Sequence, residues 1–142
     1  MPTRKLETNT YYHVYNRSFN HIKIFRTSED PLRFKRKIKC YTKKHKVIIK
    51  SFAIMDTHYH FLISQSEKTE IPSFIKALQI SHTKYFNLKY NRKGRLFTER
   101  YKAKPTTTFE YYKNIKKYIL CNPIDKALEI EINDLSSSNL PF

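Results

Sequence analysis

Two histidines separated by a single residue are the first feature of this sequence that could perform chemistry. His58 and His60 lie in the segment HYHFLIS, which is predicted to form a strand. Residues i and i+2 of a strand point to the same face, so both imidazoles would converge on one point and could bind a metal ion. Tyr59 would then face the opposite side and pack in the core. The alternative is a surface pair or a hydrogen-bonded structural pair.

A tyrosine and an asparagine near the end of a predicted helix form the second candidate pair. Tyr118 and Asn122 are four residues apart, which places them on the same helical face. A hard cation needs oxygen ligands besides two histidines, and Asn122 would supply one if this face covers the sheet near them. Tyr118 would then be placed as a nucleophile. The alternative for Tyr118 is an aromatic core residue of an amphipathic helix.

The elements that must position these residues follow from hydrophobic patterns, turn residues and prolines. Strands are predicted at 11–17, 47–54, 58–64 and 96–104, and helices at 28–45, 71–86 and 108–121. Thr108 is expected to cap the last helix, and Pro105 to stop the fourth strand. The order β-α-β-β-α-β-α indicates an α+β protein with a ferredoxin-like (split βαβ) antiparallel sheet and helices on one face. The additional C-terminal helix carries Tyr118.

Length and composition indicate one folded domain and exclude several classes of function. The 142 residues, of which 39% are hydrophobic, are predicted to form one domain over 1–132 with a loosely held tail at 133–142. The single glycine, Gly94, excludes Gly-rich phosphate-binding loops. No apolar run is long enough to cross a membrane and no secretion signal is recognised, so we expect a cytoplasmic protein without a membrane partner.

The charge of the chain predicts a polyanionic partner. Its 28 lysines and arginines against 12 acidic residues give a formal net charge of +16, and the basic residues alternate with Tyr and Phe along the whole chain. This pattern is typical of nucleic-acid binding, although a ribosome-associated or membrane-surface protein has similar composition. The basic stretch 89–93 has a plain alternative as a solvated linker. The residues predicted to bind the nucleic acid are Arg17, Lys89, Arg92, Lys93, Arg95, Arg100 and Lys102.

Three separated motifs resemble those of one known family. The segment MDTHYHFLI at 55–63 resembles the HUH motif of single-tyrosine transposases, in which U is a bulky hydrophobic residue. GRLF at 94–97 with RYK at 100–102, and YILCNP at 118–123, resemble the later blocks of the same superfamily. The resemblance covers roughly residues 11–128 and is strongest to the REP-associated tyrosine transposases and their insertion-sequence relatives.

The resemblance assigns roles to individual residues. His58 and His60 match the metal-binding histidines, Tyr118 matches the catalytic tyrosine, and Asn122 matches the third ligand. Thr57 stands where many relatives carry Asn, and the residues at 125–127 replace small and basic ones. These departures leave open whether the protein is a mobile or a domesticated transposase. Tyr101 is the alternative nucleophile, ranked lower because relatives often carry Phe there.

The resemblance also implies a reaction and its partners. The tyrosine would attack a phosphate of single-stranded or hairpin DNA, leaving a 5′-phosphotyrosine and a free 3′-hydroxyl. A divalent metal, Mg or Mn, would polarise that phosphate. The protein would be nucleoid-associated when bound to DNA, and a homodimer is possible because insertion-sequence members pair and can exchange the tyrosine helix.

Two other classes of function remain open at the level of sequence. A non-catalytic nucleic-acid-binding module on an RNA-recognition-like fold has the same order of elements and predicts exposed aromatic side chains on the sheet. A metal-dependent hydrolase that activates water needs a general base, and Asp56 is the only acidic residue next to the histidines.

Overall fold

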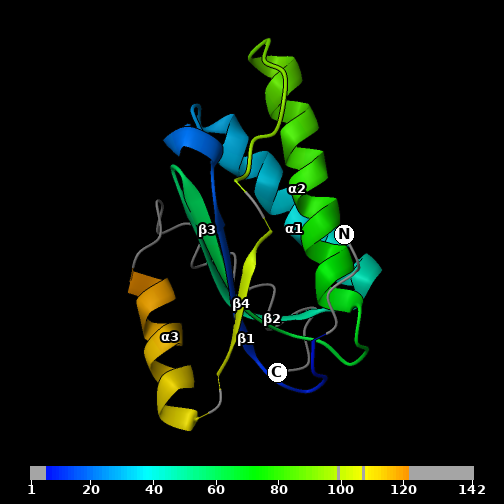
Figure 1. The fold of residues 1–142 in the computed structure, drawn as a ribbon, viewed down its shortest axis with the longest axis vertical. Helices are drawn as coiled ribbons and strands as arrows, with labels where there is room; N and C mark the ends of the chain where they lie inside the picture. Colours follow the sequence, from blue (N-terminus) through cyan, green and yellow to red (C-terminus); the bar gives the residue numbers. More distant parts are fainter. Residues whose placement is uncertain (1–5, 99, 107, 122–142) are drawn as a thin grey trace.

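The predicted order of strands and helices is confirmed by a computed structural model, which describes residues 6–98, 100–106 and 108–121 (Figure 1). The elements are β1 (Tyr12–Arg17), the 3-10 helix η1 (Phe19–His21), α1 (Glu29–His45), β2 (Ile48–Met55), β3 (His58–Ser64), α2 (Glu70–Lys89), β4 (Lys102–Pro105) and α3 (Phe109–Cys121). The predicted tail at 133–142 lies outside the described residues. None of the described helices is long and apolar enough to cross a membrane.

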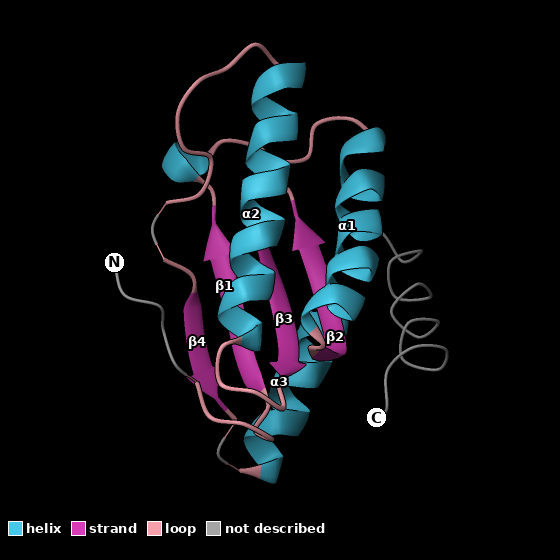
Figure 2. Ribbon diagram, turned by 90° about the vertical axis from the view of Figure 1, so that its right-hand side faces the viewer, coloured by secondary structure: helices cyan, strands magenta, loops and turns pink. Residues whose placement is uncertain are grey.

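The strands form one antiparallel sheet in the order β2-β3-β1-β4. β1 lies in the interior of the sheet because it pairs with both β3 and β4. α1 and α2 lie together on one face of this sheet, whereas α3 lies on the other (Figure 2). This is the ferredoxin-like arrangement with an additional C-terminal helix, and the predicted fold class is confirmed.

The main hydrophobic core lies between the sheet and the pair α1 and α2. Val14 of β1 and Phe61 of β3 are fully buried in it, together with Phe34 of α1 and Phe74 of α2. Tyr59, the residue between the two histidines, is also fully buried there. The prediction that Tyr59 faces the core is therefore confirmed, and strand alternation places its two neighbours on the opposite face.

A smaller cluster fills the space under α3. Ala53 of β2 and Leu62 of β3 are fully buried against Tyr112 and Ile115 of α3. Leu62 lies two residues beyond His60 on the same strand, so the side chains of both belong to the sheet face that α3 covers. α3 runs along this face from the Pro105 end of β4 toward the end of the sheet that carries the histidines (Figure 1).

α1 and α3 begin and end close to the predicted bounds, whereas α2 continues beyond the predicted residue 86 to Lys89. α1 ends at His45 because Lys46 adopts a left-handed conformation, with φ of 57°. The backbone N–H of Tyr111 donates to the Thr108 hydroxyl at 3.0 Å, which confirms Thr108 as the cap of α3.

The fourth strand is much shorter than predicted. The sequence suggested a continuous strand over 96–104, but the ladder with β1 covers only Lys102–Pro105. An unbroken ladder would pair Ser18 with position 99, whereas the observed isolated bridge joins Ser18 to Phe97. The segment between Phe97 and Lys102 therefore has two residues more than the matching segment of β1, and this excess interrupts the pairing. Pro105 is the last residue of the strand, at the sheet edge, where a missing N–H is tolerated.

A buried carboxylate ties the start of α1 to the end of α2. Asp30 has no exposed surface and accepts hydrogen bonds from the Lys89 ammonium at 2.8 Å and from the hydroxyls of Tyr85 and Tyr90. Burial alone would raise the pKa of Asp30, but these hydrogen bonds hold it well below its usual range. Lys89 is therefore an internal partner of Asp30 in this structure.

A buried histidine on α2 is held in its neutral form by its surroundings. His82 is fully buried among Phe25, Phe34 and Phe86, and its Nε2–H donates to the Ile24 carbonyl at 2.7 Å. Burial, with a smaller contribution from the charge of Arg33, lowers the pKa of His82 from 6.5 to about 4, although the hydrogen bond to Ile24 opposes this shift.

The stability of the fold is accordingly expected to fall in mild acid. Between pH 6.5 and about 4 the unfolded chain binds a proton at His82 that the folded protein does not, so unfolding becomes easier as pH falls through this window. The pKa difference corresponds to about 3 kcal/mol from this residue.

Urea unfolding at pH 7 and pH 4.5 would measure this effect. His82→Gln retains an N–H donor for the Ile24 carbonyl but does not titrate. This variant should lose less of its free energy of unfolding between the two pH values than the wild type loses. An equal loss in the two proteins would contradict the assignment to His82.

Candidate metal and nucleic-acid site

The two predicted metal-binding histidines converge on one sheet face, as their spacing predicted. Their ring centroids are 5.0 Å apart and the rings are nearly perpendicular. His60 is buried, with 7% of its surface exposed, whereas His58 is half-buried at the beginning of β3. The Nδ1 of His58 lies 3.3 Å from the Thr57 hydroxyl, so Nε2 can bind a metal when Nδ1 carries the ring proton.

A third histidine, which sequence reasoning missed, lies against this pair. His13 of β1 is buried, and its Nε2 lies 2.9 Å from the Nδ1 of His60. The alternation of Tyr12, His13 and Val14 indicates that His13 faces away from the main core. It does not reveal which residue of another strand His13 meets, because the register between β1 and β3 is not visible in the sequence.

Burial keeps these imidazoles neutral at physiological pH. Burial, together with the neighbouring His13 and His58, lowers the pKa of His60 to about 4. Burial likewise lowers the pKa of His13 to about 4, and the charge of Lys104 adds to the effect. The pKa of His58 is lowered by burial. A neutral imidazole is the form that binds a metal, so the pair is in the required protonation state.

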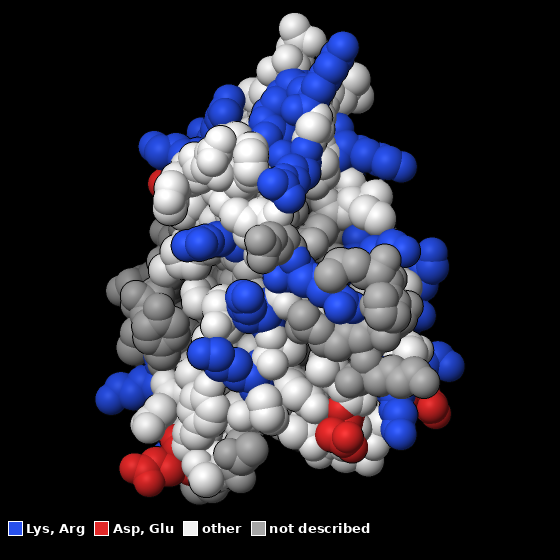
Figure 3. Space-filling view, in the orientation of Figure 1, with Lys and Arg blue, Asp and Glu red and all other residues white. Residues whose placement is uncertain are grey.

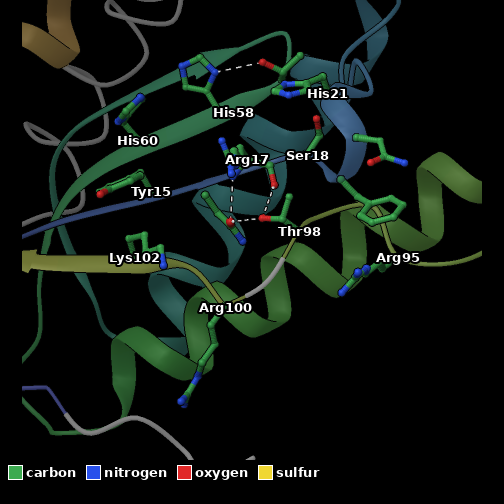
Figure 4. A pocket seen from close by; sticks show the side chains of 14 residues that line it. Tyr15, Arg17, Ser18, His21, His58, His60, Arg95, Thr98, Arg100 and Lys102 are labelled. Carbon is green, nitrogen blue, oxygen red and sulfur yellow. Dashed lines mark hydrogen bonds between the residues drawn. The ribbon is translucent and has the colours of Figure 1, made fainter.

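The histidines form one wall of a cavity of about 750 Å³. His58 and His60 enter it from β3, Tyr15 and Arg17 lie on β1, and the segment before β4 closes the other side (Figure 4). The described residues that line it are Tyr15, Asn16, Arg17, Ser18, Phe19, Asn20, His21, Thr57, His58, His60, Arg95, Thr98, Arg100 and Lys102. No aspartate or glutamate is among them, so the described walls of the cavity are neutral or positive.

The predicted nucleic-acid-binding residues separate into two groups in the structure. Arg17, Arg95, Arg100 and Lys102 line the cavity beside the histidines. Figure 3 shows the face of the molecule that is turned to the viewer in Figure 1. Lys and Arg side chains cover much of its upper and middle part, and most of the acidic residues lie near its lower edge.

The remaining three basic residues lie outside the cavity. The Lys89 ammonium is bonded to Asp30, and the Arg92 guanidinium donates to the carbonyl of Arg95 at 2.7 Å. Lys93 is exposed and does not line the cavity. The conformation of the loop after α2 therefore depends on Arg92, which no local sequence pattern reveals.

The two candidate nucleophiles occupy different parts of the fold. Tyr101 is 7% exposed and belongs to the main core on the α1 and α2 side, and it does not line the cavity. Tyr118 is in the last turn of α3, a helix that packs on the histidine face of the sheet, and Asn122 lies outside the described residues. The structure therefore separates Tyr101 from the histidines.

The histidine pair fits a divalent metal as part of a larger ligand set. Both imidazoles lie on one face with Nδ1 engaged by a neighbour, so Nε2 is the nitrogen left for a metal in the tautomer that carries its proton on Nδ1. The described residues contain no group of three His, Cys, Asp or Glu side chains able to hold a metal ion. A further ligand would therefore be a side chain of another type, a residue outside the described part of the chain, a group of the substrate or water.

The architecture and the site define a ferredoxin-like α+β domain whose histidine pair faces a basic cavity. The family model of IS200-like transposases matches residues 7–122, and the chain belongs to this family. A search of curated proteins gave no match.

Two solved structures share the fold. A REP-associated tyrosine transposase bound to a REP hairpin superposes with a TM-score of 0.65 at 13% identity, covering 94% of this chain and 78% of its own. A protein of Deinococcus radiodurans R1 assigned as a transposase has a TM-score of 0.56 at 17% identity, covering 87% of this chain and 95% of its own. At these identities the likeness establishes the fold.

Proposed function

We propose that this transposase cleaves and rejoins single-stranded or hairpin DNA through a covalent bond to Tyr118, with a divalent metal at His58 and His60. The observation that carries the proposal is the histidine pair facing a basic cavity on the same sheet face as α3. A structural neighbour of this chain was solved with a REP hairpin, which supports DNA as the partner.

The proposed reaction is a transesterification at phosphorus. The phenolic oxygen of Tyr118 forms a bond to the phosphorus of the scissile phosphate, and the bond from phosphorus to the 3′-oxygen breaks. The leaving 3′-oxygen ends as a hydroxyl, carrying a proton equivalent to the one that the phenol loses. The 5′ end stays on the tyrosine, so a later attack by a 3′-hydroxyl rejoins the strand without a nucleotide cofactor.

Different residues would bind the metal and the DNA phosphates in this reaction. Mg or Mn held by His58 and His60 would polarise the scissile phosphate, and Asn122 is the proposed additional ligand. Arg17, Arg100 and Lys102 would hold neighbouring phosphates, because they line the same cavity. The positive walls would also stabilise the charge that develops on the phosphate.

The spacing along α3 supports Tyr118 as the nucleophile. Tyr112 and Ile115 pack on the histidine face of the sheet. Position 118 is three residues beyond 115, so helical periodicity gives it the same face of α3. It is also in the last turn of α3, at the end of the helix that points toward the beginning of β3 (Figure 1).

The non-catalytic alternative receives less support from the sheet surface. An RNA-recognition-like module needs open aromatic side chains on the sheet for base stacking. Here Tyr15 packs on the rings of His13 and His60, with centroids 4.7 and 5.7 Å away, and α3 covers Ala53 and Leu62. The face is a partly covered histidine cluster instead of an open stacking platform.

The formation of a covalent adduct tests the proposal. The protein would be incubated with a labelled single-stranded hairpin oligonucleotide and Mn²⁺, and the products separated on a denaturing gel. A labelled species at the mass of protein plus cleaved DNA is expected, and it should be absent with EDTA. Binding without any adduct would favour the non-catalytic module, whereas cleavage without an adduct would favour a hydrolase.

Binding of DNA should weaken steeply with salt, and the cavity should account for part of the slope. Each phosphate contact with single-stranded DNA contributes about 0.7 to the slope of log K against log salt. Arg17→Ala together with Lys102→Ala should therefore reduce the slope by about 1.4. Fluorescence anisotropy at several salt concentrations would measure this change.

A matched control uses basic residues on the other side of the sheet. Arg36 and Lys39 are exposed on α1, which contributes no side chain to the cavity. Replacing both with Ala removes the same charge and should leave the slope nearly unchanged. Equal effects of the two double variants would show that net charge, and not the cavity, determines binding.

A further inference from the structure

His13 contacts a candidate metal ligand directly, and the proposed reaction has so far given it no role. Its Nε2 lies 2.9 Å from the Nδ1 of His60. Both residues are buried, with 8% of His13 and 7% of His60 exposed. A contact between two buried polar atoms at this distance is a hydrogen bond that water does not replace.

The sheet holds the two rings in a fixed relation. His13 lies opposite Leu62 and His60 lies opposite Tyr15, so the two histidines are diagonal neighbours on β1 and β3. Their rings are nearly parallel, with 13° between the planes. The Tyr15 ring packs on both of them, which restricts the rotation of either ring.

The hydrogen bond determines which nitrogen of His60 can bind a metal. A neutral imidazole carries one proton, and the nitrogen without it is the ligand. When Nδ1 of His60 donates to His13, the proton is on Nδ1 and the lone pair is on Nε2. If His13 bound a metal through Nε2 and His60 through Nδ1, the 2.9 Å hydrogen bond between these two nitrogens would have to break.

We propose that His13 is a positioning residue, which accepts the Nδ1–H of His60 and thereby fixes the tautomer and orientation in which His60 binds the metal through Nε2. This inference rests on the proposed metal site. The Thr57 hydroxyl stands in the corresponding position toward His58, at the longer distance of 3.3 Å. The rigid, buried partner is therefore the one on His60.

Metal affinity of two variants provides the first test. His13→Gln places an amide oxygen near the position of Nε2 and retains an acceptor, whereas His13→Leu fills the space without one. Electron paramagnetic resonance with Mn²⁺ would give dissociation constants, with thermal unfolding as the check on folding. The Gln variant should bind Mn²⁺ nearly as the wild type does, and the Leu variant about 10- to 100-fold more weakly.

The outcomes separate this inference from the proposed function. If the wild type binds no Mn²⁺, the proposed metal site fails and the inference fails with it. If the wild type binds but both variants bind equally well, His13 is a packing residue only and the inference alone is overturned. If both variants lose binding equally while remaining folded, His13 is itself a ligand, which also overturns the inference.

The tautomer of His60 can be read directly in the metal-free wild-type protein. Nitrogen-15 NMR with histidine labelling distinguishes a protonated Nδ1 from a protonated Nε2. The proposal requires the proton of His60 on Nδ1, and a proton on Nε2 would overturn it. This measurement needs no substitution, so it stays decisive if the Leu variant does not fold.

Discussion

Replacing Tyr118 with phenylalanine is expected to abolish the covalent protein–DNA adduct while leaving DNA binding nearly unchanged. Only the phenolic oxygen is lost, and phenylalanine keeps the ring. Because Tyr118 is the only nucleophile in the proposed mechanism, cleavage should fall by more than about 10³-fold. The adduct assay on a denaturing gel measures the loss, and anisotropy with the same hairpin measures binding.

Two other tyrosines serve as matched comparisons for this substitution. Tyr111→Phe makes the same chemical change on the same helix and should retain the adduct. Tyr101→Phe should also retain it, because Tyr101 lies in the core away from the cavity. If the adduct persists in Tyr118→Phe but is lost in Tyr101→Phe, the nucleophile is Tyr101 and not Tyr118. An adduct that survives both changes would exclude these two tyrosines as the nucleophile.

Loss of either histidine of the pair is expected to remove metal-dependent cleavage. His60→Ala deletes a proposed ligand and the partner of His13, so Mn²⁺ binding should be lost and cleavage should fall by at least about 10²-fold. His58→Ala should have a similar effect. Calorimetric titration with Mn²⁺ and the adduct assay would measure the two consequences separately.

Other substitutions define how specific that result is. Asn122→Ala should weaken the metal dependence without removing the nucleophile, so cutting should persist at high Mn²⁺. His45→Ala, at the end of α1 on the other side of the sheet, should leave both measurements unchanged. Full adduct formation by His60→Ala in the presence of EDTA would contradict a metal-dependent mechanism.

The elements that carry the site could be predicted from local patterns. HYHFLIS formed the strand β3 with the predicted bounds, and its two-residue period placed His58 and His60 on one face. Thr108 began α3 through a hydrogen bond within one turn of helix. Each of these features depends on residues close together in the chain, where backbone geometry relates the side chains directly.

The shape of β4 shows where local patterns stop being sufficient. The residues at 96–104 look suitable for one strand, yet pairing is interrupted between Phe97 and Lys102. β1 itself continues to Arg17, and Ser18 still pairs with Phe97, so the break comes from the two additional residues in the segment that leads into β4. The interruption also brings Arg100 into the wall of the cavity.

The sequence by itself determined the order of elements, the facing of His58 and His60, and the basic character of the chain. The tertiary structure decided which residues meet: it joined His13 to His60, placed Tyr101 in the core, and engaged Lys89 with Asp30. The physical reason is that these contacts join residues 47 and 59 positions apart, or depend on which face of a packed sheet a segment reaches. Strand register and packing determine such contacts, and neither is encoded in the spacing of neighbouring residues.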